Sequence, residues 1–408
     1  GFITLKAHPM FRRTFRKYDD LNASVQENVT NIRVVKAYVK ESAETDKFKT
    51  AAGNLKKMFM KAENILVFNN PVMQLTMYCC ILALSWMGAR MIVGSALTTG
   101  ELMSLFTYTM NILMSLMMLS MIFVMLSMSM ASAQRIAEIL EEKPSIVNPE
   151  NPAMTVADGS IEFDHVAFGY YAGKDKYVLE DINLKIKAGE TIGILGPTGS
   201  SKSTLMSLIP RLYDASEGTV RVGGVDVRHY DLDSLRNSVA MVLQKNVLFS
   251  GTIKDNLRWG NEQATDEEMI HACKLACADE FIRQFPKGYD TYIEQGGTNV
   301  SGGQKQRLCI ARALLKKPKV LILDDSTSAV DTRTDSMIRK AFREEIPNTT
   351  KLIISQRISS IEDADRIVVL NEGRIEGVGT HAELLASNAI YQEVYETQKK
   401  GEDEHEQA

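Results

Sequence analysis

The order of charged and apolar positions divides the chain into three stretches. The first, residues 2–61, is rich in charge but keeps apolar side chains at helical spacing. No proline or glycine interrupts it between Phe11 and Ala52. We therefore expect long helices here, with an apolar face that includes Val25, Val29, Ile32, Val35 and Val39.

Two long intervals without any charged side chain follow. One lies between Glu63 and Arg90, and the other lies between Glu101 and Arg135. Each is longer than the roughly 20 apolar residues that cross a lipid bilayer. The alternative is two buried helices of a soluble protein, but such helices usually carry a polar stripe. The pattern therefore favours two membrane-spanning helices within residues 64–134.

The distribution of basic residues predicts how these helices are oriented. Residues 6–61 contain thirteen lysines and arginines, whereas the connection at residues 94–100 contains none. Basic residues are enriched on the cytoplasmic side of membrane helices. We expect a multi-pass plasma membrane protein in which this hairpin has a short outward loop and two cytoplasmic ends. Because the chain starts with Gly1 inside an apolar segment, we also expect it to be truncated at its N-terminus, with further membrane helices upstream.

The second uncharged interval is rich in methionine, whose flexible thioether adapts to irregular apolar shapes. Two interpretations remain open: these side chains line a path for mixed hydrophobic substrates, or they face lipid and neighbouring helices. The residues are Met103, Met110, Met114, Met117, Met118, Met121, Met125, Met128 and Met130.

The third stretch has a different pattern. Residues 135–159 read as a linker, because Pro, Asn and Glu gather from Pro144 onwards. From residue 160, short β-branched runs alternate with helical segments, which is typical of an α/β domain with a mainly parallel sheet. We place this domain at 160–396, with an acidic tail at 397–408. The runs are IEFDHVAF, TIGILG, SVAMVLQ, KVLILDD, TKLIISQ and DRIVVLNEG.

A glycine-containing loop between a strand and an apolar helix predicts a phosphate-binding site for ATP with Mg²⁺. Its backbone N–H groups would bind phosphate oxygens, Lys202 would reach the β- and γ-phosphates, and Ser203 would ligate Mg²⁺. Ser201 replaces the second glycine of the motif, so we expect weaker binding or a distorted loop. The loop comprises Gly196, Pro197, Thr198, Gly199, Ser200, Ser201, Lys202, Ser203 and Thr204.

Two further segments carry candidate chemistry. The apolar run 320–325 ends in two carboxylates, of which Asp324 is expected to hold Mg²⁺ through water and Asp325 to face the γ-phosphate. Residues 301–304 open a helix with a glycine pair, which suits phosphate binding but is also compatible with an ordinary loop cap.

Together, the phosphate loop, the SGGQ segment and the strand beyond it resemble the nucleotide-binding domain of ATP-binding cassette (ABC) transporters. The NIRVVKAY segment resembles the second intracellular loop of the exporter type, of which multidrug and lipid exporters are members. The resemblance implies a type I ABC exporter fold: an α-helical transmembrane hairpin with long cytoplasmic helices, then an α/β P-loop NTPase (RecA-like) domain. That domain would have an antiparallel β subdomain and a helical subdomain at about 245–312.

The resemblance also implies positions for the rest of the chain. Residues 1–63 would hold the cytoplasmic end of the fourth transmembrane helix and the second intracellular loop, and 64–134 the fifth and sixth helices. The coupling helix would lie near 31–38, although an ordinary amphipathic helix remains an alternative. Glu294 would contact the intracellular helices, or would simply be solvated.

Roles at the nucleotide follow from the same resemblance. Tyr170 would stack on adenine, with Tyr171 as the alternative. Gln244 would be the Q-loop glutamine and a Mg²⁺ ligand, and Asp331 would belong to the D-loop. The signature sequence would consist of Ser301, Gly302, Gly303 and Gln304.

In addition to Ser201, two positions depart from the family pattern. The family has a glutamate after the Walker B aspartate, and here Asp325 would place its carboxylate about 1.5 Å further back, as a weak general base. The family has a switch histidine where this chain has Gln356, which can bond a γ-phosphate but carries no charge. Unrelated drift is one explanation. The intact signature instead favours the degenerate-site subunit of a bacterial heterodimer.

We therefore expect an ATPase subunit with low turnover at its own site, exporting a small amphipathic substrate with a second half-transporter. A homodimeric slow exporter and a nucleotide-sensing regulatory subunit are the alternatives; the two spans oppose a soluble cassette ATPase.

A net charge of −4 gives no global basic surface for nucleic acid. The cysteines lack metal-site spacing and suit a reducing cytosol; they are Cys79, Cys80, Cys273, Cys277 and Cys309.

Overall fold

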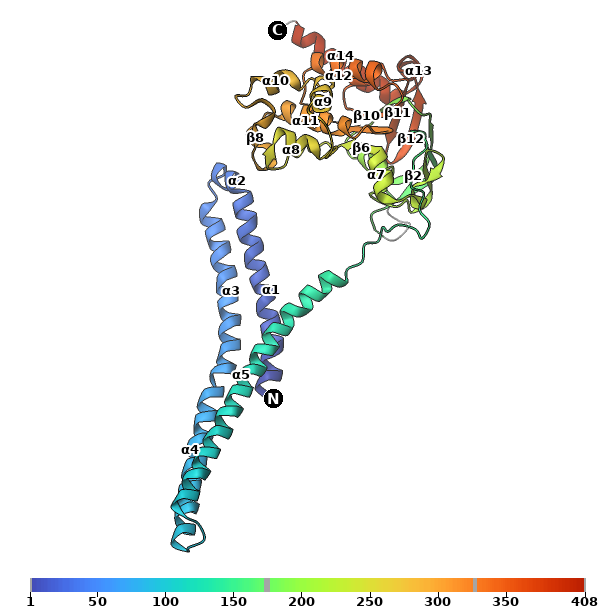
Figure 1. Ribbon diagram of the computed structural model, residues 1–408. Helices are drawn as coiled ribbons and strands as arrows, with labels where there is room; N and C mark the ends of the chain where they lie inside the picture. Colours follow the sequence, from blue (N-terminus) through green and yellow to red (C-terminus); the bar gives the residue numbers. More distant parts are fainter. Residues whose placement is uncertain (1, 172–176, 326–328, 407–408) are drawn as a thin grey trace. The chain divides into compact units, whose positions relative to one another are not determined.

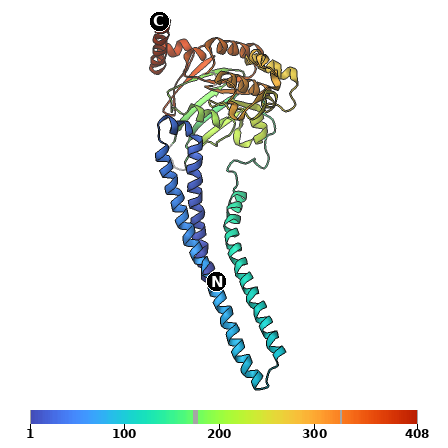
Figure 2. The same cartoon turned by 90° about the vertical axis from the view of Figure 1, so that its left-hand side faces the viewer.

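The structure, a computed structural model, describes residues 2–171, 177–325 and 329–406 (Figures 1 and 2). It consists of two units, Gly1–Lys143 and Pro144–Ala408. Each unit has its own architecture, the first helical and the second built on two β-sheets.

Long helices form the first unit. Helices α1 and α3 pack along each other, and the short α2 lies at the turn between them (Figure 1). Helices α4 and α5 form a second pair. The bounds are α1 (Phe2–Thr30), α2 (Ile32–Ala37), α3 (Glu41–Val67), α4 (Asn69–Val93) and α5 (Thr99–Glu141).

Two of these helices carry the membrane-spanning stretches. Pro71–Val93 of α4 and Thr99–Phe123 of α5 are long and apolar enough to cross a bilayer. The turn between them ends at a capping box, in which the Thr98 backbone N–H donates to Glu101 Oε2 at 2.8 Å and Thr98 Oγ1 accepts from the Glu101 N–H at 3.3 Å. Helix α5 continues to Glu141, so the beginning of the predicted linker is helical. Its residues there include good helix formers, and Pro144 is the first proline beyond them.

A six-stranded sheet forms the centre of the second unit, in the order β12-β11-β3-β10-β9-β6. All neighbours are parallel except the edge strand β12, which confirms the predicted mainly parallel sheet. The strands are β3 (Thr191–Leu195), β6 (Val239–Val242), β9 (Val320–Asp324), β10 (Thr350–Ile354), β11 (Arg366–Asn371) and β12 (Arg374–Gly379).

A four-stranded antiparallel sheet, in the order β2-β1-β4-β5, packs on the first sheet. Buried side chains of both sheets share one core, with Phe163 and Ile182 from the antiparallel sheet and Ile192 and Ile322 from the parallel one. The run IEFDHVAF therefore forms β1 here rather than a parallel strand. The strands are β1 (Ile161–Phe168), β2 (Leu179–Ile186), β4 (Glu217–Val222) and β5 (Val225–Asp226).

Helices and short turns complete this unit. Figure 1 shows α8 to α11 gathered on one side and β2 and β12 on the other. The elements are α6 (Lys202–Leu208), α7 (Leu232–Ser238), α8 (Ile253–Arg258), α9 (Asp266–Leu275), α10 (Asp279–Gln284), α11 (Gly302–Leu315), α12 (Thr332–Glu345), α13 (His381–Ser387), α14 (Ala389–Glu406), the strands β7 (Gly251–Thr252) and β8 (Tyr292–Ile293), and the 3₁₀ turns η2 (Val227–His229), η3 (Gly288–Asp290), η4 (Gln295–Gly297) and η5 (Ile358–Ser360).

The two ends of this unit differ from the expected linker and tail. Within residues 144–159, the Ala153 N–H donates to the His229 carbonyl at 2.8 Å, and Val156 is buried, so this segment packs on the second unit. The predicted acidic tail continues α14 as far as Glu406, and residues 407–408 lie outside the described residues. Apolar contact and backbone bonds, which composition does not reveal, account for the packing of residues 144–159.

Candidate nucleotide-binding site

The carboxyl ends of neighbouring parallel strands bring the predicted chemistry to one edge of the sheet. The phosphate loop follows β3, Asp324 ends β9, Gln356 follows β10, and Gln244 follows β6. The register is direct, because Ile354 of β10 is paired with Ile194 of β3 and with Asp324 of β9. Ligands of open α/β sheets bind outside the carboxyl ends of the strands. This edge is therefore the candidate nucleotide site.

Lys202 lies at the centre of the phosphate loop, as the first residue of α6. Its Nζ donates to the carbonyls of Gly196 at 2.7 Å and Pro197 at 2.8 Å, and to Ser200 Oγ at 3.2 Å. Burial lowers the pKa of Lys202, although the nearby Asp324 and Asp325 carboxylates act in the opposite direction. The loop thus holds a buried cation against its own backbone, at the place where the motif positions phosphate oxygens.

Ser201 occupies a backbone conformation that suits glycine. Its φ of 69° and ψ of 24° lie in the left-handed region, immediately before α6 begins. A side chain in this region costs roughly 1–2 kcal/mol. The loop still leads into the helix at Lys202, so the serine is accommodated at an energetic cost rather than by abolishing the loop.

Asp324 lies close to Ser203, whose side chain favours the charged form of the Asp324 carboxylate. Asp324 is only 5% exposed. Burial raises the pKa of Asp324 and the Asp325 charge adds to this, whereas Ser203 and Lys202 oppose it. These oxygen atoms and that of the exposed Gln244 are hard donors that fit Mg²⁺. Ser203, Asp324 and Gln244 would hold the ion, which would neutralise charge on the β- and γ-phosphates.

Asp325 faces the Q-loop. Gln244 Nε2 donates to Asp325 Oδ2 at 3.4 Å, and the Asp325 backbone N–H donates to the Ile354 carbonyl at 3.0 Å. The φ of Asp325 is 45°, again in the left-handed region. The backbone of β10 and the Gln244 amide therefore both contribute to where this carboxylate lies.

Tyr170 is tied to the phosphate loop by its hydroxyl, which lies 2.9 Å from Thr204 Oγ1. Its ring meets Phe168 edge-on, with centroids 5.0 Å apart, and Tyr213 edge-on at 5.3 Å. The side chain remains 51% exposed, compared with 77% for Tyr171. Tyr170 thus combines a fixed ring with an open surface, as a residue that stacks on adenine requires.

The signature residues lie on another element, at the start of α11. Ser301 caps the helix: its Oγ accepts from the Gln304 N–H at 3.3 Å, and its own N–H donates to Gln304 Oε1 at 3.0 Å. Gly302 and Gly303 pack on the segment before α12, where a Cβ on Gly303 would come within 2.8 Å of the Ala329 carbonyl oxygen. A side chain larger than hydrogen is therefore excluded at Gly303 unless this segment moves.

The D-loop position joins the same cluster. Asp331 caps α12 by accepting from the Thr334 N–H at 2.9 Å, and this bond lowers the pKa of its carboxyl. Gln306, which sequence reasoning missed, accepts from the Ala329 N–H at 3.0 Å. The Gln306 side chain therefore links the predicted signature helix to the segment before the predicted D-loop residue. In the sequence, the spacing of Gln306 from the glycine pair was the signal that could have indicated this contact.

Glu294 and α2 present exposed side chains. Glu294 Oε2 accepts from Thr298 Oγ1 at 2.8 Å. On α2, Ile32 is 47% and Val34 is 56% exposed, and Tyr38 directly after the helix is 72% exposed. Apolar side chains displayed on a charged helical hairpin are typical of a surface that contacts another protein segment.

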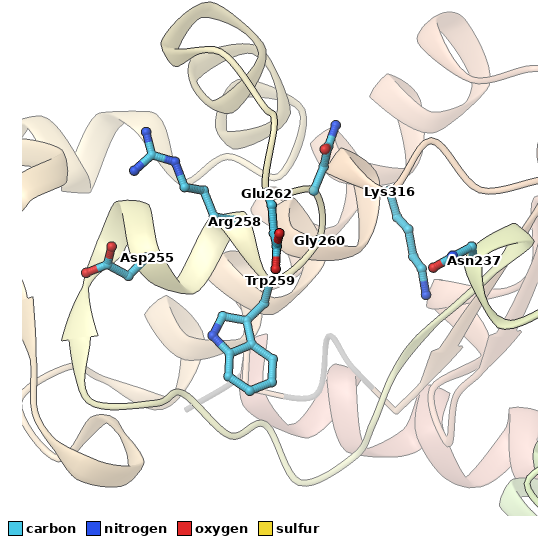
Figure 3. Close-up of a pocket in the computed structure, with 8 residues that line it drawn as sticks. Asn237, Asp255, Arg258, Trp259, Gly260, Glu262 and Lys316 are labelled. Carbon is cyan, nitrogen blue, oxygen red and sulfur yellow. The ribbon is translucent and has the colours of Figure 1, made fainter. Parts of the chain in front are cut away.

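An exposed aromatic pair was also not identified from the sequence. Phe249 and Trp259 stack with centroids 4.0 Å apart and an interplanar angle of 7°, and Trp259 is 64% exposed. Trp259 is one of only two tryptophans in the sequence, which was a signal available beforehand. It lines a cavity of about 820 Å³ (Figure 3), together with Asn237, Asp255, Arg258, Gly260, Asn261, Glu262 and Lys316.

Comparison with known proteins decides the family. The model of the ABC transporter family matches residues 179–328, and that of the ABC transporter transmembrane region matches residues 1–134. The chain is 38% identical over 400 residues to the uncharacterized ABC transporter ATP-binding protein YfiB of Bacillus subtilis, covering 97% of this chain and 69% of that protein. The chain belongs to the ABC transporter family.

Two more relatives of this ABC transporter chain are informative. It is 37% identical over 399 residues to the ATP-dependent lipid A-core flippase of Desulfotalea psychrophila, covering 97% of this chain and 69% of the flippase. The structure of a bacterial Atm1-family ABC exporter with ATP bound superposes with a TM-score of 0.87 and 31% identity, covering 97% of this chain and 70% of that exporter.

These matches confirm the predicted exporter fold, the ATPase class and the location. The chain is an ATP-binding and permease subunit of an ABC exporter, in the plasma membrane with its nucleotide-binding domain in the cytoplasm.

Proposed function

We propose that this exporter subunit pairs with a different half-transporter and contributes two unequal parts to the dimer. Its phosphate loop belongs to a site that holds ATP and turns it over slowly, and its signature completes a competent site. The observation that carries this proposal is Asp325, which stands after Asp324 where the family has glutamate. A carboxylate withdrawn by about one bond length costs about a hundredfold in rate.

Two other positions at the site support the same conclusion. Gln356, at the switch position, can donate a hydrogen bond to a γ-phosphate but cannot supply the positive charge of a histidine. At Ser201, a residue with a side chain adopts a left-handed backbone conformation. The signature helix, in contrast, keeps its cap and its glycine pair. The departures therefore gather on the phosphate-loop side.

We propose a small amphipathic substrate, such as a drug, lipid or peptide. Five exposed methionines of α5 fall on one helical face, since they are separated by 11, 4, 3 and 4 residues. They are Met103, Met114, Met118, Met121 and Met125. A flexible apolar face suits varied substrates, and a lipid-facing role is the alternative. The lipid A-core flippase among the relatives supports a lipid-like cargo.

We further propose that α2 acts as the coupling helix and docks on the nucleotide-binding domain of the opposite subunit. Its exposed Ile32 and Val34 are the apolar contacts that such docking needs. The stacked and exposed pair Phe249–Trp259 is the apolar surface of that domain that would receive these side chains.

The test restores the family residues in the complete exporter. The full-length protein is purified with the subunit that accompanies it, and ATP turnover is measured for Asp325→Glu combined with Gln356→His. We expect turnover at the site of this chain, measured with the competent site inactivated, to rise at least tenfold, because the base regains its length and the switch its charge. Asp233→Glu, the same chemical change at an exposed position of α7, is the matched control and should change nothing.

Other outcomes separate the alternatives. Unchanged turnover in the double variant would show that Asp325 and Gln356 do not limit hydrolysis. Rapid hydrolysis by this subunit alone would favour a homodimeric exporter in which Asp325 acts as the base. ATP binding without any transport would favour the nucleotide-sensing regulatory subunit.

A further inference from the structure

The loop that carries Gln356 is anchored at both ends. At its start, the Ser355 N–H donates to the Ile194 carbonyl at 3.3 Å, and Ser355 Oγ accepts from the Arg357 N–H at 3.0 Å. At its far end, the buried Ser360 Oγ donates to Asp335 Oδ2 of α12 at 3.0 Å. Both ends are therefore fixed to the core, and the segment between them carries the switch residue.

A single side chain from the C-terminal helix holds the middle of this loop. Gln398 Nε2 donates to the Gln356 carbonyl at 2.6 Å, and Gln398 Oε1 accepts from the Ile358 N–H at 2.9 Å. One amide thus bonds the backbone on both sides of Arg357. Only the carbonyl of Gln356 is used in this contact, while the residue stays exposed.

Helix α14 is itself well anchored before it reaches the loop. Tyr391 is fully buried, and its hydroxyl lies 2.7 Å from His381 Nδ1 of α13. Gln392 Nε2 donates to the Leu385 carbonyl at 2.7 Å. Gln398 follows Tyr391 by seven residues, about two turns, and so lies on the same face of the helix. The anchored start of the helix therefore determines where Gln398 sits.

We propose that Gln398 is a positioning residue of the nucleotide site. By fixing the carbonyl of Gln356, it sets the point from which the Gln356 side chain reaches a γ-phosphate, and it makes α14 part of the apparatus that distinguishes ATP from ADP. This inference rests on the proposed role of Gln356. ADP has no γ-phosphate, so its binding does not depend on Gln356 or on the bonds that hold it.

The test compares ATP and ADP affinities of the full-length exporter by displacement of a fluorescent nucleotide. Gln398→Met preserves side-chain length and helix propensity but removes both hydrogen bonds. We expect ATP affinity to fall about three- to tenfold, as the loss of one or two hydrogen bonds implies, with ADP affinity unchanged. Gln398→Glu retains the acceptor for Ile358 but loses the donor to Gln356, so it should also lower ATP affinity.

The matched control is Gln392→Met. It removes a side-chain-to-backbone bond of the same kind from the same helix, but one that is directed to α13. It should leave the ratio of ATP to ADP affinity unchanged. If Gln398→Met weakens both nucleotides equally, or neither, the positioning role is overturned.

A Gln356→Ala variant separates the inference from the proposed function. If Gln356→Ala reduces the preference for ATP and Gln398→Met does not, the positioning role of Gln398 alone is overturned. If Gln356→Ala leaves the preference intact, both the role of Gln356 and the inference are overturned.

Discussion

Ser201 and Asp325 share a backbone feature, a positive φ of 69° and 45° respectively. Each occupies a position where the chain departs from the family pattern, and each lies at the carboxyl edge of the parallel sheet. Left-handed backbone costs a residue with a side chain roughly 1–2 kcal/mol. Strain of this kind persists only where the surrounding structure maintains it. At the residue scale, the backbone conformations of these loops therefore lower the stability of the folded protein.

Replacing Ser201 with glycine should therefore stabilise the protein. Ser201→Gly removes the cost of the left-handed conformation but gives the unfolded chain more freedom, so we expect a net gain of about 0.5–1 kcal/mol. Thermal unfolding of the nucleotide-free exporter checks it. Ser207→Gly, inside α6, is the control and should destabilise, because glycine weakens a helix interior. A lower melting temperature for Ser201→Gly would contradict the strain argument.

Substitutions at Tyr170 should separate its hydroxyl from its ring. Tyr170→Phe loses only the contact with Thr204, so we expect ATP affinity to fall about two- to fivefold. Tyr170→Ala also loses base stacking, worth about 1–3 kcal/mol, and should cost at least tenfold. Nucleotide titration measures both. Tyr171→Ala is the control; if it weakens ATP more than Tyr170→Ala does, Tyr171 is the stacking residue.

At the scale of elements, α2 is a short helix whose value lies in its exposed face. Six residues are too few to be stable alone, so α1 and α3 hold it in place. A bond from Asn28 Nδ2 to Glu44 Oε2, 2.8 Å long, joins those two helices near the turn. Helices α1 and α3 therefore fix the position of the apolar side chains at this turn.

If α2 docks on the opposite subunit as proposed, placing a charge on this face should uncouple transport from ATP binding. We expect Val34→Glu to abolish ATP-dependent movement of an amphipathic dye in membrane vesicles while ATP affinity stays within twofold, because a docked carboxylate would be desolvated. Val29→Glu on α1 is the control, since Val29 is 70% exposed outside α2. Full transport by Val34→Glu would exclude this face from coupling.

At the scale of the whole molecule, the phosphate loop and the signature lie on different elements, β3–α6 and α11. A nucleotide site assembled from two subunits can therefore combine unequal halves. In the heterodimer proposed above, the departures Ser201, Asp325 and Gln356 would affect one half of one site, and this chain would give the other site an intact signature.

This asymmetry predicts which nucleotide stays bound. After a brief incubation with Mg²⁺ and ATP followed by rapid desalting, ATP should remain at the site of this chain while ADP is found at the other. Quantifying both nucleotides, with cross-linking to assign them to subunits, measures this. The Asp325→Glu and Gln356→His double variant should retain ADP instead. Complete conversion to ADP in the unmodified exporter would refute the slow site.

The sequence was sufficient wherever function depends on contiguous residues. The strand at 191–195 with its phosphate loop and the paired carboxylates at 324–325 are each contiguous, so the sequence predicted them as candidate phosphate and Mg²⁺ positions. The two uncharged stretches predicted the membrane spans and the alternation of strands and helices predicted the α/β domain, whereas the exporter fold was implied by the family resemblance of the motifs.

Long-range contacts could not be predicted in this way. Gln398 lies 42 residues from Gln356 in the sequence, and glutamine on an amphipathic helix is chemically ordinary. The stacking of Phe249 on Trp259 and the packing of residues 144–159 likewise depend on segments that meet only after folding. The missing glycine at Ser201 predicted weaker binding or a distorted loop, whereas the contact of Asp325 with Gln244 had no signal in the sequence.

Lys202 gives the nucleotide site a kinetic property. Its ammonium group already has three oxygen partners within the loop, from Gly196, Pro197 and Ser200. An incoming triphosphate must draw it away from them, so association comprises an encounter and a later rearrangement. The observed rate constant for binding should then level off at high ATP concentration. Its limiting value would be the rate at which the Lys202 ammonium group breaks its hydrogen bonds to the loop.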